Sequence, residues 1–260
     1  MTEYRIDLNA DLGEADSVDA LVADRAIMPV ISSCSIACGG HIGNAATMRT
    51  TLQLAAHHDV TAGAHPSYPD RANFGRVSMD MAAPELRDSL VAQIGALMNI
   101  AGELGIRLRH IKPHGALYND AAGNPVLAQQ LIRIFSEAFP DLAIVGLAGG
   151  AMEQAAATAG KDYIPEAFAD RRYTDNSHLQ PRSEPGAVIT DWQEQAEQAL
   201  AIALRHRVAS NSGRPVAVRA QTLCLHGDTP GAAENAAKVR QALEAKGVTI
   251  ESNALRSPAL

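Results

Sequence analysis

The sequence predicts an α/β fold in which parallel strands close, or nearly close, into a (β/α) barrel. Short apolar segments alternate with amphipathic helices along the 260 residues, which indicates a parallel sheet. Six of these segments end in ionisable side chains, as strands do at the catalytic face of a barrel. No repeat and no linker rich in Pro, Gly and Ser interrupts the pattern. We therefore expect a single domain over residues 1–260.

Seven segments have the pattern of barrel strands. Residues 4–8 alternate polar and apolar side chains, and residues 142–147 are apolar throughout, as a buried parallel strand should be. The other five segments are residues 30–36, 60–64, 107–112, 163–168 and 222–225. Residues 248–251 form a possible terminal strand.

Helices are expected between these strands. The clearest one covers residues 84–105, where apolar residues recur at steps of three and four and mark one apolar face. Asn44 is expected to cap a helix that runs to His58. Asn124–Pro125 and Thr229–Pro230 open two further helices, the second with its threonine as the N-cap.

Composition argues against several classes of protein. The 22 basic and 29 acidic residues give a net charge of 22 − 29 = −7, which argues against a nucleic-acid binder. The sequence contains no run of about 20 apolar residues, so no membrane span is expected. The N-terminus has no basic and apolar leader, and three cysteines are too few for a disulfide scaffold. A cytoplasmic location is the simplest expectation.

Ionisable residues gather where the predicted strands end, and a barrel would bring these ends together. Asp7, Asn9 and Asp11 occupy alternate positions of the first strand and therefore share one face. With Glu14 just beyond them, they indicate ligand binding, metal binding or a general base. The alternation also places Lys112 on the same side as His114. A lysine held near these carboxylates is a point charge that could bind an oxyanion or a phosphate.

Histidines follow the second and third strands. His41 and His65, joined by Asp11, would make a three-ligand divalent-metal site with an open position. Further charged strand ends are Asp170, Arg171, His226 and Asp228, which could equally be structural ion pairs. No P-loop or dinucleotide-binding glycine motif follows any strand, so those two nucleotide sites are not expected.

Several blocks of the sequence resemble, in order, the LamB/YcsF family of 5-oxoprolinase A subunits. The blocks are DLNADLGE at 7–14, IACG at 36–39 with His41 and Gly43, GAHPSYPD at 63–70, FGR at 74–76, KPHGALYN at 112–119, Glu166 with FADR at 168–171 and Tyr173, Pro181 with Arg182, and HGD at 226–228. They cover residues 5 to about 245. The chain departs from the family pattern around His41, at Ser35, Gly40 and Asn44, and also at Val77 and near Asn176–Ser177.

The resemblance implies an irregular seven-stranded (β/α) barrel, similar to the glycoside hydrolase and deacetylase superfamily. It also implies ATP-dependent cleavage of the lactam 5-oxoproline (pyroglutamate) to L-glutamate, with ATP as co-substrate hydrolysed to ADP and phosphate. Subunits B and C would be the partners in that reaction.

On this hypothesis Lys112 and Arg171 stabilise the negative oxygens, and Asp11 or His114 is the base. Asp170 joins this catalytic group. The substrate-binding group comprises Asp7, Asn9, Glu14, His41, His65, His226 and Asp228. Three alternatives remain open: an autonomous metal-dependent amidohydrolase or deacetylase, a non-catalytic lactam-binding protein within a larger complex, and a Schiff-base lyase that uses Lys112.

Overall fold

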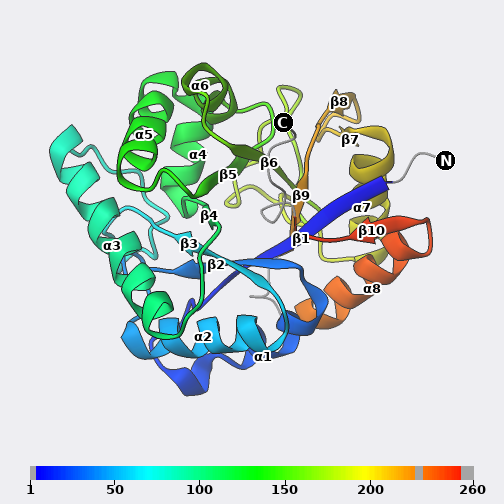
Figure 1. Cartoon of the computed structure of the whole chain (residues 1–260). Coiled ribbons are helices and arrows are strands. Elements are labelled where there is room, and N and C mark those ends of the chain that lie inside the picture. Colours follow the sequence, from blue (N-terminus) through cyan, green and yellow to red (C-terminus); the bar gives the residue numbers. More distant parts are fainter. Residues whose placement is uncertain (1–3, 226–230, 253–260) are drawn as a thin grey trace.

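A closed barrel of seven parallel strands forms the centre of the protein, as Figure 1 shows for the computed structural model, which describes residues 4–225 and 231–252. The strands pair in the order β1-β2-β3-β4-β5-β6-β9, and β9 pairs back with β1. Their bounds are Tyr4–Leu12, Ser33–Ala37, Thr61–His65, His110–Ile111, Ala143–Leu147, Tyr163–Phe168 and Thr222–Cys224. The predicted seven-stranded (β/α) barrel is confirmed. The single-domain organisation over residues 1–260 stays a prediction.

The first strand is long enough to serve two neighbours on one side. Its beginning, from Tyr4 to Ile6, pairs with β10 (Val248–Ile250), and its next residues, from Asp7 to Asn9, pair with β9. The predicted terminal strand therefore exists, but it lies outside the closed barrel. The structure also contains a hairpin that we did not expect, formed by β7 (Arg207–Ala209) and β8 (Pro215–Ala217).

Helices surround the barrel (Figure 1). Their bounds are α1 (Val22–Ile27), α2 (Ala45–His57), α3 (Ala83–Glu103), α4 (Gly115–Gly123), α5 (Pro125–Ala138), α6 (Ala151–Ala159), α7 (Trp192–Arg205) and α8 (Ala232–Glu244), with short 3₁₀ turns at Val18–Ala20 and Met28–Val30. None of the described helices is both long and apolar enough to cross a membrane.

The helix starts follow from capping side chains. Asn44 accepts from the backbone N–H groups of Ala46 and Thr47, and the Thr47 hydroxyl accepts from the N–H of Asn44. The Asn124 side chain caps α5 by accepting from the backbone N–H groups of Val126 and Leu127. The last helix differs from the expectation, because α8 begins at Ala232 with Gly231 in the capping position. The predicted cap at Thr229 lies outside the described residues.

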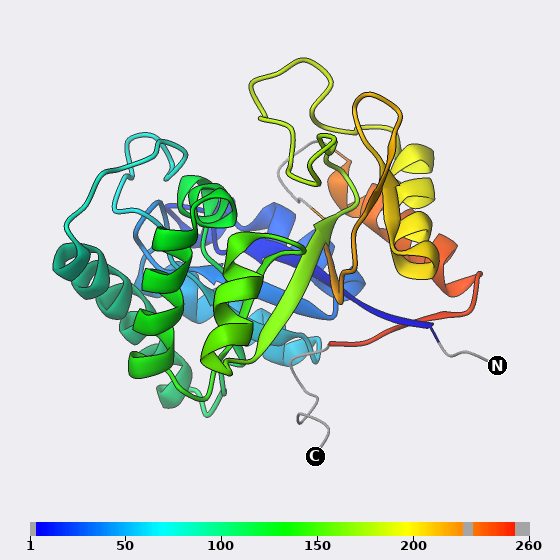
Figure 2. The ribbon, with the colours of Figure 1, turned by 90° about the horizontal axis from the view of Figure 1, so that it is seen from above.

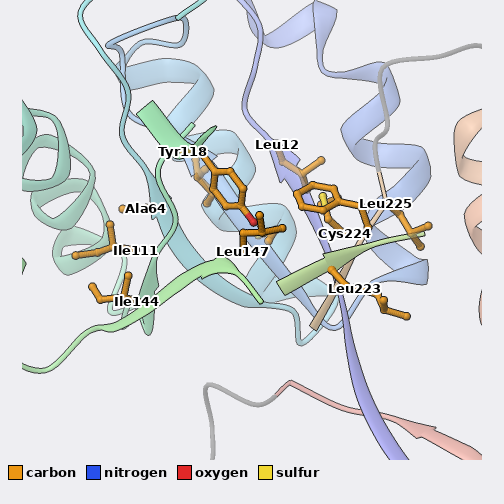
Figure 3. Close-up of a cluster of buried hydrophobic side chains, with 14 of the residues drawn as sticks. Leu12, Ala64, Ile111, Tyr118, Ile144, Leu147, Leu223, Cys224 and Leu225 are labelled. Atoms are coloured by element: carbon orange, nitrogen blue, oxygen red, sulfur yellow. The ribbon is translucent and has the colours of Figure 1, made fainter. Parts of the chain in front are cut away.

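Apolar side chains hold the barrel wall in place. Figure 3 shows part of a buried apolar cluster, whose labelled residues lie in the barrel strands, just after β9 at Leu225, and in α4 at Tyr118. Its labelled members are Leu12, Ala64, Ile111, Tyr118, Ile144, Leu147, Leu223, Cys224 and Leu225. Because side chains alternate along a strand, the remaining strand positions are free to carry polar residues. The segments that follow β3 and β6 both project on one side of the barrel (Figure 2).

A glycine in β3 is required by close packing inside the barrel. A Cβ atom at Gly63 would lie 2.3 Å from the imidazole of His110, which is buried and bonded to the Ser35 hydroxyl. We expect Gly63→Ala to lower the free energy of unfolding by about 1–3 kcal/mol, measured by urea denaturation. Gly102→Ala in α3 is the matched control, because nothing lies within 4 Å of its added Cβ. A Gly63→Ala protein as stable as this control would contradict the packing explanation.

Candidate active site

A cavity of about 540 Å³ lies at the carboxyl ends of the barrel strands. Its polar wall comprises Asp11, Glu14, His65, Arg76, Lys112, His114, Asn119, Arg171, His178, Gln180, Arg182 and Ser183. The cavity size is in the range of small-molecule sites, which are about 300–1,000 Å³. Two groups of largely buried side chains contribute five of these lining residues, namely Asp11, Glu14, His65, Lys112 and His114.

The first group centres on the ammonium of Lys112, just after β4. Its Nζ lies 2.7 Å from Oε1 of Glu166, 3.0 Å from Oδ1 of Asp11 and 3.2 Å from Oδ1 of Asn9. Lys112 is 2% exposed and Glu166 is fully buried. We call these four residues the lysine centre.

Electrostatics keep the Lys112 amine protonated. Burial alone would lower its pKa, but Asp11, Cys224 and Glu166 together raise the pKa of Lys112 well above its usual value. A protonated amine is a fixed cation for a negative oxygen. It is also a poor nucleophile, which argues against the Schiff-base alternative.

The second group is a set of three imidazoles around one carboxylate. Oε1 of Glu14 lies 3.1 Å from Nε2 of His41, 3.1 Å from Nδ1 of His114 and 3.7 Å from Nε2 of His65. His41 and His114 stack with ring centroids 3.7 Å apart. We call Glu14, His41, His65 and His114 the histidine–glutamate cluster. Its four ligand atoms all lie within 4.8 Å of one another, so these side chains could hold a metal ion.

The charges in this cluster follow from its contacts. Burial alone would raise the pKa of Glu14, but hydrogen bonds with His114 and His41 outweigh it and lower that pKa. Burial lowers the pKa of His41 to about 4. His65 shows the opposite balance, because the Asp11 carboxylate overcomes burial and raises its pKa. At neutral pH the cluster therefore contains an ionised carboxylate and an uncharged His41.

Glycines place the cluster residues. Gly13 has φ +72° directly after β1, and its N–H donates to the buried Asp24 carboxylate at 2.7 Å. This turn brings Glu14 over the end of the barrel. Gly75 has φ +62°, and a Cβ there would lie 2.9 Å from Cβ of His41 and 3.1 Å from Cδ2 of His114. Only a residue without a side chain lets this loop approach the imidazoles so closely.

The structure brings most of the predicted site residues to the cavity. Residues that line it are Asp11, Glu14, His65, Lys112, His114 and Arg171. His41 is 1% exposed and stacks against His114, so it supports the wall. Asp170 is buried and does not line the cavity. His226 and Asp228 lie outside the described residues, so their predicted substrate binding stays a prediction.

Asp7 and Asn9 lie deeper in the barrel than Asp11. Asp7 is 4% exposed and accepts from the hydroxyls of Ser32, Ser33 and Thr222, and burial raises its pKa. Asn9 donates to Oε1 of Glu166 and to the Thr222 hydroxyl. The shared face of β1 is therefore as expected, but only Asp11 of the three reaches the cavity.

Three residues of the site were not among our predicted site residues. Glu166 is the buried partner of Lys112, and its signal was a carboxylate inside the otherwise uncharged segment 163–168. Arg76 and Arg182 line the cavity, as Arg171 does. Their signal was their position in the sequence blocks at 74–76 and 181–182.

The three departures from the family pattern around His41 are explained by packing away from the cavity. Ser35 is fully buried with its hydroxyl 3.1 Å from Nε2 of His110. A Cβ at Gly40 would lie 2.3 Å from Oε1 of Gln93, which occupies the space a larger residue would need. Asn44 caps α2. None of the three lines the cavity.

Comparison with known proteins identifies relatives that match nearly the whole chain. The LamB/YcsF family profile matches residues 6–257. A protein from Syntrophobacter fumaroxidans, named as the A subunit of 5-oxoprolinase, is 44% identical over 95% of this chain and 97% of its own length. A protein of the same name from Streptomyces avermitilis is 45% identical over 94% of this chain and 98% of its own length.

Solved structures agree with these relatives. The lactam utilization protein from Thermus thermophilus superposes with a TM-score of 0.88 at 41% identity, over 95% of this chain and 99% of that one. A protein from Enterococcus faecalis named for cellobiose-phosphate cleavage is 11% identical with a TM-score of 0.59, over 97% of this chain and 98% of its own, and shows the fold alone. The chain therefore belongs to the LamB/YcsF family.

Proposed function

We propose that this chain is the A subunit of an ATP-dependent 5-oxoprolinase, which opens the lactam 5-oxoproline to L-glutamate. ATP is hydrolysed to ADP and phosphate in the same cycle, and subunits B and C are its partners. The observation that carries the proposal is a cavity that combines the fixed cation of Lys112 with the carboxylate of Asp11. Relatives at 44–45% identity that are named as the A subunit of 5-oxoprolinase support the choice of substrate.

The cavity offers complementary groups for each part of this substrate. 5-Oxoproline carries a carboxylate, an amide oxygen and an amide N–H on a five-membered ring. Three arginines at the cavity wall, Arg76, Arg171 and Arg182, match carboxylate or phosphate oxygens. Lys112 would face the oxygen that becomes negative as the ring opens. Asp11 would accept the proton of the attacking water.

Coupling to ATP would overcome the low reactivity of the amide carbon toward water. Transfer of a phosphoryl group to the amide oxygen makes the ring carbon electrophilic. Water then attacks that carbon and gives its proton to the base, the carbon–nitrogen bond breaks, and the nitrogen takes up a proton. A further water hydrolyses the resulting acyl phosphate to glutamate and inorganic phosphate. The cations of the wall would stabilise the negative oxygens in both steps.

A second function is favoured by the histidine–glutamate cluster. With a divalent ion held there, the chain could act alone as a metal-dependent amidohydrolase. The two functions differ in what they require. The first needs ATP and partner subunits, and the second needs neither. The remaining alternative is a protein that only binds the lactam. It predicts that this chain alone binds the lactam without turnover, and that the assembled complex keeps its turnover when cavity residues of this chain are substituted.

The deciding experiment measures glutamate release from 5-oxoproline, with and without ATP, by this chain alone and with subunits B and C. Turnover that requires ATP and all subunits is the expected result. Turnover by the isolated chain without ATP would instead establish the amidohydrolase. All three cysteines are buried and unpaired, which supports our proposal of a cytoplasmic location. The mixture is therefore assayed under reducing conditions.

An arginine pair in the segment after β6 provides a matched test of anion recognition. Arg171 is 6% exposed, lines the cavity and donates to the carbonyl of Gln180. Arg172 instead pairs with Glu194 and does not line the cavity. We expect Arg171→Ala to lower kcat/KM for 5-oxoproline about 100-fold, and Arg172→Ala to change it less than about 3-fold. Equal effects of the two substitutions would contradict the assignment of Arg171.

A further inference from the structure

We infer that the histidine–glutamate cluster is a binding site for one divalent transition-metal ion of the zinc class. Binding itself is independent of the proposed function, and only the role of the ion rests on it. Three features of the cluster support the inference: the direction of the imidazole lone pairs, the spacing of the ligand atoms and the kind of donor present.

Backbone carbonyls fix the imidazole tautomers. Nδ1 of His65 donates to the carbonyl of Lys112 at 2.8 Å, and Nε2 of His114 donates to the carbonyl of Phe74 at 3.0 Å. The other nitrogen of each neutral ring then carries a lone pair. Imidazoles that ligate metals have this arrangement, in which the outer N–H bonds to a carbonyl or carboxylate and orients the ring.

The two lone pairs converge on one point. Nε2 of His65 and Nδ1 of His114 lie 3.0 Å apart, and Oε1 of Glu14 lies 3.1 Å from the second of them. Two lone pairs and a carboxylate oxygen repel one another at this separation unless a positive charge lies between them. That charge is either a proton or a cation.

The spacing fits a metal ion. A tetrahedral zinc ion with ligand bonds of about 2.0–2.1 Å holds its ligand atoms roughly 3.3 Å apart. Four separations within the cluster, 3.0, 3.1, 3.1 and 3.7 Å, bracket that value, and all four ligand atoms lie within 4.8 Å of one another. The rings are also held rigidly, since His41 stacks on His114 and the Phe74 ring packs edge-on against both. A preformed and rigid set of ligands lowers the cost of binding.

The donor set selects the metal. Three imidazoles and one carboxylate suit zinc, cobalt, nickel or copper, whereas magnesium and calcium prefer oxygen ligands. The structure also changes the ligand set that the sequence suggested. Oδ1 of Asp11 contacts Lys112 at 3.0 Å, and Glu14 and His114 complete the group instead. Within the proposed function, an ion at the cavity wall would supply a Lewis acid for the amide oxygen, with Asp11 beside it.

The test uses the full chain alone, without lactam, ATP or partner subunits, so its result is independent of the assay for the proposed function. Protein stripped with a chelator is loaded with zinc, cobalt(II) or magnesium, freed of excess metal by gel filtration and analysed for bound metal. We expect about one zinc or cobalt ion per chain and no magnesium. We also expect a higher Tm with zinc, because an ion that binds only the folded state stabilises it.

Ligand identity is tested by matched substitutions. His114→Gln and Glu14→Gln should weaken zinc binding at least about 10–100-fold. His57→Gln, on the exposed end of α2, should bind zinc as the wild type does. Wild-type protein loaded with cobalt(II) gives a readout that does not depend on how the variants fold. Its visible spectrum should indicate four-coordinate nitrogen and oxygen ligation.

Three outcomes would overturn the inference. The first is wild-type protein that retains no zinc or cobalt. The second is a thiolate signature in the cobalt spectrum, which would place the ion at Cys34, Cys38 or Cys224. The third is wild-type zinc affinity in a folded His114→Gln variant. The first of these would mean that a proton balances the charge of the cluster.

Discussion

A Lys112→Met variant is expected to lose about 3–5 kcal/mol of its free energy of unfolding and, within the proposed function, to have no turnover when it is assembled with subunits B and C. The stability loss follows from Glu166, whose fully buried carboxylate lies 2.7 Å from the ammonium. Without that cation, a negative charge is left in a site that excludes water. Turnover is lost because no other described lysine lines the cavity. Urea denaturation measures the first effect, and glutamate release measures the second.

Two further variants separate charge from packing. Lys246→Met, at an exposed lysine, should change the free energy of unfolding by less than about 0.5 kcal/mol. Glu166→Gln added to Lys112→Met should restore most of the lost stability, because the neutral amide no longer needs a cation, but it should not restore turnover. A single Lys112→Met variant as stable as the wild type would contradict the account of the lysine centre.

Asp11→Asn should lower kcat for 5-oxoproline by about 10²–10⁴-fold while leaving KM within a few-fold of wild type. Asp11 is the carboxylate of β1 that reaches the cavity, and its two oxygens lie 3.0 Å from Nζ of Lys112 and 3.3 Å from Nε2 of His65. Asparagine preserves the shape of the side chain but cannot accept a proton from water. Stability should change less than in Lys112→Met, because the ammonium retains Glu166.

The pH profile of kcat distinguishes a base from a positioning residue. Loss of a base removes the acidic limb of the profile, whereas a positioning defect lowers the whole curve without changing its shape. Asp16→Asn is the control, since its exposed carboxylate pairs with Arg71. An Asp11→Asn enzyme within about tenfold of wild-type kcat would exclude Asp11 as the base and would favour His114, the other candidate.

The order of elements was predictable because it depends on local patterns. Apolar segments, amphipathic periodicity and a capping residue such as Asn44 act over a few neighbouring residues, and the strands and helices formed where these signals occurred. These local signals did not predict the strand pairs that depend on contacts with distant parts of the chain. The β7–β8 hairpin is made of two three-residue strands, too short to show an alternation. The outward position of β10 depends on which part of β1 it meets.

Local sequence patterns were enough to show which side chains stand at strand ends and which residues share a face, as Asp7, Asn9 and Asp11 do. Alternation along a strand sets the face because successive side chains point to opposite sides. Tertiary structure decided the depth of each residue and its partners across the barrel. Closure and inter-strand register placed Glu166 against Lys112 and gathered the histidine–glutamate cluster from segments after β1, β2 and β4 and the end of β3. No local pattern encodes these contacts, because residues far apart in the chain meet only when the barrel closes.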